Sequence, residues 1–66
     1  MNYIVQYFVF DKSGNHIIKA CGVPCETMDE VHDTKQQLVS LWEEEKDTTQ
    51  LLVSCGNDIL FSSNND

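Results

Sequence analysis

The sequence predicts an α+β fold in which a single helix packs on a four-stranded antiparallel sheet, in the order ββ-α-ββ. Two apolar segments joined by a polar turn open the chain, one segment of helical periodicity spans its middle, and two short apolar segments close it. One helix laid across one antiparallel sheet hides both apolar surfaces with the fewest elements. We expect a single compact domain over residues 1–62, followed by a frayed polar tail at 63–66.

The N-terminal segment, residues 2–10, is rich in β-branched and aromatic side chains and is predicted to be a strand. Its alternation gives two largely apolar faces, one of Tyr3, Val5, Tyr7 and Val9 and the other of Ile4, Gln6, Phe8 and Phe10. We therefore expect a central strand, or a strand with one face covered by a second copy of the chain. After a turn at 11–15, a returning strand is expected at 16–21, and Gly22-Val23-Pro24 is expected to end it.

A capping box at Thr27 and Glu30 predicts the start of a helix that runs from about Met28 to about Lys46. At about 100° per residue, one side of this helix forms an apolar stripe, which also includes the stem of Lys35. The stripe consists of Met28, Val31, Leu38, Val39 and Trp42. No glycine marks the C-terminal end of this helix. Two further strands are expected at residues 50–55 and 59–61, joined by a tight turn.

The charge of the chain narrows the choice of partner. Eleven acids stand against four lysines, and the net charge is −7. Direct binding of nucleic acid requires cations that replace the counterions of phosphate, so neither nucleic acid nor an anionic membrane is expected as a direct ligand. A basic protein surface is the favoured partner, and the same charge also serves solubility. Without a signal peptide or a long apolar run, a cytoplasmic location is expected.

Most of the negative charge falls in residues 26–47, where eight acids meet two lysines. The helical wheel groups a candidate binding face opposite the apolar stripe, consisting of Glu26, Asp29, Glu30, Asp33, Gln36, Gln37, Glu43, Glu44 and Asp47. The helix dipole favours acids near the N-terminus, but it disfavours those near the C-terminus by roughly 0.3–1 kcal/mol each. Three roles stay open for this face: solubility, docking on a basic protein, and imitation of nucleic-acid phosphates.

The residues that could carry catalysis form no recognisable constellation. Three cysteines, Cys21, Cys25 and Cys55, are expected to be reduced thiols. Their spacing differs from the C-x2-C pattern of zinc sites, and neither His16 nor His32 belongs to a nucleophile or metalloprotease motif. Cys25 precedes the helix, a position where thiols can become reactive, but no basic residue adjoins it. We expect no enzyme, no metal and no cofactor.

The sequence favours a small, acidic, non-enzymatic protein that inhibits a larger nucleic-acid-binding protein through its acidic helix face. In size, charge and architecture the chain resembles phage-encoded inhibitors of bacterial defence, such as anti-CRISPR proteins and DNA mimics. The resemblance carries over no residues, and it implies a viral protein that acts in the host cytoplasm. The alternative is a self-assembling homodimeric module that scaffolds a protein or sequesters a small ligand, which the two-faced strand 2–10 and the sheet edges favour.

Overall fold

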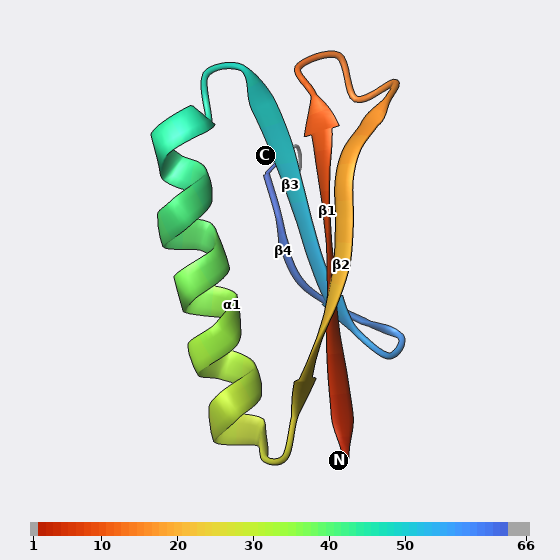
Figure 1. Cartoon of the computed structure of the whole chain (residues 1–66), viewed down its shortest axis with the longest axis vertical. Coiled ribbons are helices and arrows are strands. Elements are labelled where there is room, and N and C mark those ends of the chain that lie inside the picture. Colours follow the sequence, from red (N-terminus) through yellow and green to blue (C-terminus); the bar gives the residue numbers. More distant parts are fainter. Residues whose placement is uncertain (1, 64–66) are drawn as a thin grey trace.

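A computed structural model describes residues 2–63 and places one helix against one face of a four-stranded sheet (Figure 1). The elements follow the predicted order: β1 (Tyr3–Asp11), β2 (Ile17–Cys25), α1 (Met28–Trp42), a short 3-10 turn η1 (Glu43–Glu45), β3 (Thr49–Cys55) and β4 (Asp58–Ser62). All strand pairs are antiparallel, and the strand order is β2-β1-β3-β4. The expected α+β fold is therefore confirmed, and β1 is a central strand as its composition predicted.

The core lies between the helix and the sheet face that α1 covers. Its fully buried side chains are Val5, Val31 and Val53, one each from β1, α1 and β3. Trp42 closes the C-terminal end of the helix over the sheet, with its ring 5.7 Å from that of Phe61 in an edge-on arrangement. The Trp42 indole N–H also donates to the carbonyl of Thr49, at 3.4 Å. These contacts fix which face of α1 points outward.

The second strand is longer than the sequence predicted. Gly22-Val23-Pro24 does not end it, because β2 continues to Cys25 and pairs with β1 as far as Tyr3. Since β2 lies at the edge of the sheet, it has a neighbour on one side only. A proline is tolerated there, because its missing N–H can face away from that neighbour.

Two turns depend on glycine. Gly14, with a φ of +79°, lies in the β1–β2 turn, where the Asp11 carboxylate accepts from the Ser13 hydroxyl and the Asn15 N–H, both at 2.9 Å. Gly56, with a φ of +62°, is the first residue of a two-residue turn between β3 and β4. That position suits a type II′ hairpin turn, in which glycine removes the steric penalty of a positive φ.

The helix begins where the capping box predicted, and its last turn is 3-10 rather than α-helical. The Thr27 hydroxyl accepts from the Glu30 N–H at 3.2 Å, while the Glu30 carboxylate accepts from the N–H of Glu26. The helical backbone continues to Glu45, close to the expected end near Lys46, but only residues up to Trp42 are α-helical and the last turn is the 3-10 turn η1. At its end, the Glu45 carbonyl accepts from the Thr48 N–H and the Thr49 hydroxyl, which draws the chain out of the helix.

Two smaller expectations also need adjustment. The sequence predicts Met28 in the apolar stripe, but 46% of its surface is exposed, because it lines the wide cleft at the end of the sheet together with Tyr3 and Cys55. Ser63, which the sequence placed in the polar tail, exchanges two hydrogen bonds with Leu51 of β3. The rest of that tail, residues 64–66, lies outside the described residues.

Candidate docking surfaces

The predicted acidic face is presented on the outer side of α1 and on its flanks. We call this surface the acidic face and define it by the nine residues of the sequence prediction, all of which are exposed: Glu26, Asp29, Glu30, Asp33, Gln36, Gln37, Glu43, Glu44 and Asp47. The buried Val31 and the half-buried Leu38, Val39 and Trp42 anchor the opposite side of the helix in the core. The exposure of these residues agrees with the helical periodicity, although Glu26 and Asp47 lie outside the helical segment and η1 rather than α1 carries Glu43 and Glu44.

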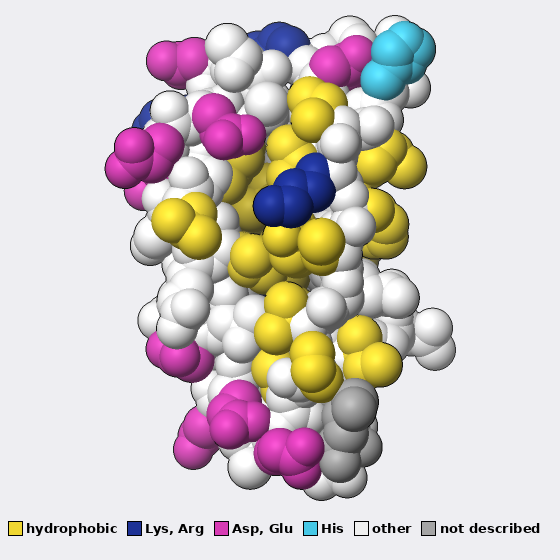
Figure 2. Space-filling view, viewed as in Figure 1, with side chains coloured by type: hydrophobic (Ala, Val, Ile, Leu, Met, Phe, Trp, Pro, Cys, Tyr) yellow, Lys and Arg dark blue, Asp and Glu magenta, His cyan; other side chains and the backbone are white. Residues whose placement is uncertain are grey.

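The charges of the acidic face fall into two clusters. Figure 2 shows acidic side chains gathered at the two ends of the helix, with uncharged side chains between them. The N-terminal cluster contains Glu26, Asp29, Glu30 and Asp33, and the C-terminal cluster contains Glu43, Glu44 and Asp47. Between them lie Gln36, Gln37, Ser40 and the apolar Leu41, which is 70% exposed. The face is consequently a pair of negative patches rather than a continuous stripe.

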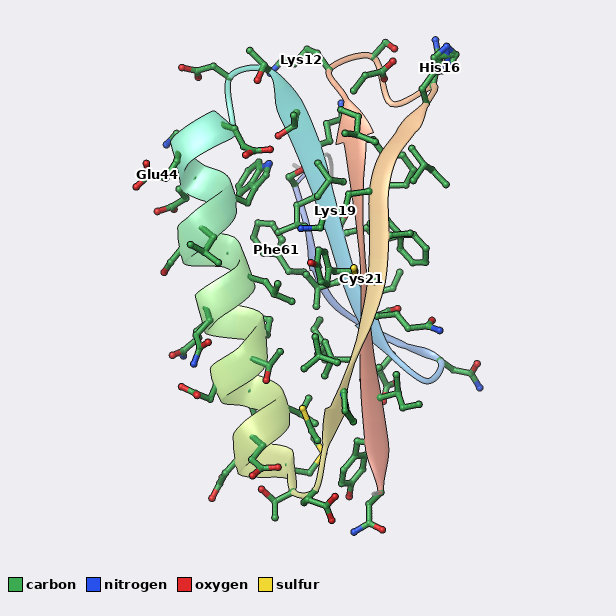
Figure 3. All side chains as sticks on the ribbon, viewed as in Figure 1. Lys12, His16, Lys19, Cys21, Glu44 and Phe61 are labelled. Atoms are coloured by element: carbon green, nitrogen blue, oxygen red, sulfur yellow. The ribbon has the colours of Figure 1, made fainter. Side chains whose placement is uncertain are left out.

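The acids of the two clusters differ in how far the fold already uses them. Glu30 takes part in the helix cap, and Asp33 accepts a 2.9 Å hydrogen bond from the Gln37 amide. Asp47 shares a surface depression with Lys12 and Lys46, which reduces the local negative potential. The side-chain carboxylates of Glu43 and Glu44 make no hydrogen bond or ion pair with any residue in the described range 2–63. Figure 3 shows Glu44 directed away from the sheet.

A second surface lies on the side of the sheet opposite α1. The cross-strand register places apolar side chains from all four strands together there, and we call this surface the open face: Ile4, Phe8, Phe10, Ile17, Leu52 and Ile59. The polar Gln6, Gln50 and Ser54 lie among them. Ile4, Ile17 and Ile59 are 49%, 60% and 67% exposed. In the described part of the chain, α1 and η1 are the only helices, and α1 packs on the other face.

A shallow groove runs between α1 and the edge strand β2. It encloses about 130 Å³ and is lined by Tyr7, Val9, Lys19, Leu38, Leu41, Trp42, Glu45 and Leu51. Lys19 extends from β2 into this groove (Figure 3), and its ammonium nitrogen lies 5.9 Å from the centre of the Tyr7 ring. A typical small-molecule pocket has roughly 300–1,000 Å³, so this groove is too small to enclose a ligand of that kind.

A broader cleft lies at the end of the sheet where β1 extends beyond β3. It measures about 620 Å³ and is lined by residues from β1, the start of α1 and the β3–β4 turn, including Tyr3, Met28, Cys55 and Asp58. Its size would admit a small molecule. Its lining brings together one carboxylate and one thiol, without a histidine or lysine, so it offers no paired acid and base.

The cysteines and histidines are dispersed over the fold. Cys25 is buried against α1, with its sulfur 3.8 Å from the Val23 carbonyl and 3.5 Å from the Thr34 hydroxyl, whereas Cys21 is exposed on β2. His16 lies in the β1–β2 turn and His32 on α1, both exposed. Among the described residues, no three His, Cys, Asp or Glu side chains are grouped closely enough to hold a metal ion.

Sequence reasoning missed two features of these surfaces. Leu41 falls outside the predicted apolar stripe. Its position on the helical wheel, between the core residues and the acids, was the signal that could have indicated an exposed apolar side chain. The position of Lys19 at the groove could not be predicted from the sequence, because it depends on how α1 packs beside β2.

Within residues 2–63, no helix has the length and apolar character needed to cross a bilayer. Comparison with known protein families, curated proteins and solved structures finds no match.

Proposed function

We propose that this chain is a non-enzymatic binding protein that docks on a larger, basic, nucleic-acid-binding protein through its acidic face and thereby inhibits it. In size, charge and architecture the chain resembles phage-encoded inhibitors of bacterial defence, and this resemblance supports a role of this kind. The partner would supply lysine and arginine side chains that otherwise contact phosphate. Occupying those cations would keep nucleic acid out of the partner's groove.

The observation that carries the proposal is the position of Glu43 and Glu44. Both follow the last turn of α1, where the helix dipole disfavours negative charge, and that turn contains no basic residue. Both are exposed and make no contact that offsets this cost within the described residues. Carboxylates that cost stability and serve no structural contact are best explained by a partner that binds them.

The spacing of the two clusters sets the size of the matching surface. Asp29 and Glu43 are 14 residues apart in the sequence, a separation of about 21 Å along a helix with about 1.5 Å rise per residue. A basic groove that holds several successive phosphates of a duplex would span both clusters, since duplex DNA carries one charge per about 1.7 Å of axis. The uncharged middle, with exposed Leu41, would face the floor of such a groove.

The test compares two variants of equal net charge. Glu43→Gln/Glu44→Gln and Asp58→Lys each raise the net charge by two, but only the first alters the acidic face, because Asp58 is exposed at the β3–β4 turn. Each tagged protein is used to capture partners from bacterial lysate at low and at high salt. We expect capture by the wild type and Asp58→Lys, weak capture by the glutamine variant, and a sharp loss as the Debye length falls from about 10 Å to about 3 Å.

A second measurement distinguishes inhibition from simple association. The captured protein is mixed with duplex DNA or RNA, and this chain is then added in stoichiometric amounts. We expect the wild type to displace the nucleic acid and the Glu43→Gln/Glu44→Gln variant to leave it bound. The proposal fails if the two equal-charge variants capture alike, or if the captured protein retains its nucleic acid in the presence of the wild type.

A further inference from the structure

Among residues 2–63, the open face is the large surface that the fold leaves both apolar and uncharged. The cross-strand register identifies the residues whose side chains lie on this side of the sheet. Each of these side chains is apolar or neutral. An antiparallel sheet with one solvated face normally alternates apolar residues inward with polar residues outward. Here Ile4, Phe8, Phe10 and Leu52 occupy outward positions of the two central strands, and the Phe8 and Phe10 rings lie 6.4 Å apart.

From this arrangement we infer that the open face is the interface of a homodimer, in which two sheets pack face to face. The result would be a four-layer assembly, helix–sheet–sheet–helix, with the two sheets about 10 Å apart as in β-sandwiches. A twofold interface uses the same patch on both copies. The inference does not depend on the acidic face, because it concerns the opposite side of the molecule.

The distribution of charge favours a second copy of the chain as the occupant. Each chain carries a net charge of −7, so two copies would repel if their acidic faces met. Pairing through the open face places the two helices outermost, with both sheets between them. Helix diameters of about 10 Å and the sheet spacing of about 10 Å put the helix axes roughly 30 Å apart, well beyond the Debye length of about 8 Å at physiological salt. A charged partner would find no complementary group on this face.

The area of the face sets the expected strength of the dimer. Four strands at about 4.8 Å spacing and about seven residues in length give a footprint of roughly 450 Å² per copy, or roughly 900 Å² for both. Specific interfaces usually bury about 1,200–2,000 Å², and smaller ones belong to weak, reversible complexes. We therefore expect a rapid monomer–dimer equilibrium with a dissociation constant in the micromolar range.

Two glutamines provide a matched pair of variants. Gln6 is exposed near the centre of the open face, between Gly22 of β2 and Ser54 of β3, whereas Gln36 is exposed on the outer side of α1. Gln6→Lys and Gln36→Lys make the same chemical change and the same change in net charge. Neither removes buried apolar surface, so both are expected to fold. Because β1 is a central strand, Gln6→Lys also leaves the sheet edges unaltered.

Sedimentation equilibrium over a wide range of protein concentrations measures the outcome. We expect the wild type and Gln36→Lys to dimerise alike and Gln6→Lys to dimerise at least ten-fold more weakly, because each dimer would bury two unpaired ammonium groups. Denaturant unfolding at low concentration checks that both variants are folded. The inference is overturned if the wild type remains monomeric at its highest soluble concentration, or if Gln6→Lys associates as strongly as Gln36→Lys. The same measurement separates the two proposals, since Glu43→Gln/Glu44→Gln should leave the dimer intact.

Discussion

Replacement of Thr27 by alanine should destabilise the protein through the loss of a single hydrogen bond. The Thr27 hydroxyl accepts from the Glu30 N–H at 3.2 Å, and this N–H is one of the donors that have no partner within a helix. Removing such a cap typically costs about 1 kcal/mol. For a chain of 66 residues, an unfolding entropy of about 2.1 cal/mol/K per residue amounts to about 0.14 kcal/mol/K. The melting temperature should therefore fall by about 7 °C.

Thermal and urea unfolding of Thr27→Ala, followed by Trp42 fluorescence and circular dichroism, would measure the effect. Trp42 is a suitable reporter because it packs on the Phe61 ring at the other end of α1. Thr27→Ser is the matched control, since serine keeps the accepting oxygen and should retain most of the stability. The reasoning would be refuted if Thr27→Ala lost less than about 0.3 kcal/mol, or if serine lost as much as alanine.

This prediction also bears on which acids can be tested for binding. The Glu30 carboxylate accepts from the Glu26 N–H next to the cap, so changing Glu30 would alter the helix start as well as its charge. A loss of partner binding in a Glu30 variant would therefore have two explanations. Glu43 and Glu44 have no such second role among the described residues, which is why they carry the binding test.

Two further predictions concern the core and the first turn. Val31 is fully buried between α1 and the sheet, so Val31→Ala should lower the free energy of unfolding in urea by about 2–3 kcal/mol. Val39 is only partly buried, and Val39→Ala is the matched comparison. A loss for Val31→Ala no greater than that for Val39→Ala would contradict the packing described above. Ser13→Ala should raise the pKa of Asp11 towards its ordinary value, because the Ser13 hydroxyl is the main cause that lowers it. When the pKa of a carboxyl group is lower in the folded state than in the unfolded state, its ionised form stabilises the fold at pH values above the unfolded-state pKa. This stabilisation is lost as the pH falls through the folded-state pKa. The stability advantage of the wild type over Ser13→Ala should therefore shrink on acidification, and an unchanged Asp11 titration by NMR would disprove the assignment.

The sequence predicted the elements well because their signals are local. β-branched and aromatic residues marked β1, a short apolar run marked β3, and the Thr27–Glu30 spacing marked the start of α1. The errors arose where the outcome depends on neighbours in space. Pro24 looks like a terminator until β2 is known to be an edge strand. The helical segment ends after η1, where the Glu45 carbonyl accepts hydrogen bonds from Thr48 and Thr49.

The two candidate surfaces were predictable to different degrees. Helical periodicity located the acidic face, because one angle per residue suffices to group its members. It did not reveal that Glu30 is engaged at the cap or that Asp47 lies near two lysines, since both depend on how the chain folds back. For the open face, alternation in residues 2–10 indicated a second apolar side. Its continuation across Leu52 and Ile59 required the strand order, which no single segment contains.

The central place of β1 has a consequence for how the chain folds during synthesis. β1 leaves the ribosome first and can form a hairpin with β2, since the two are joined by a short turn. Its other neighbour is β3, whose last paired residue, Cys55, is the partner of Val5. The β1–β3 pairing can therefore be completed only after residues up to Cys55 have emerged, and contacts so distant in sequence form slowly. Until then the nascent hairpin exposes apolar side chains on both sides, and this is the stage at which the protein is most prone to aggregate.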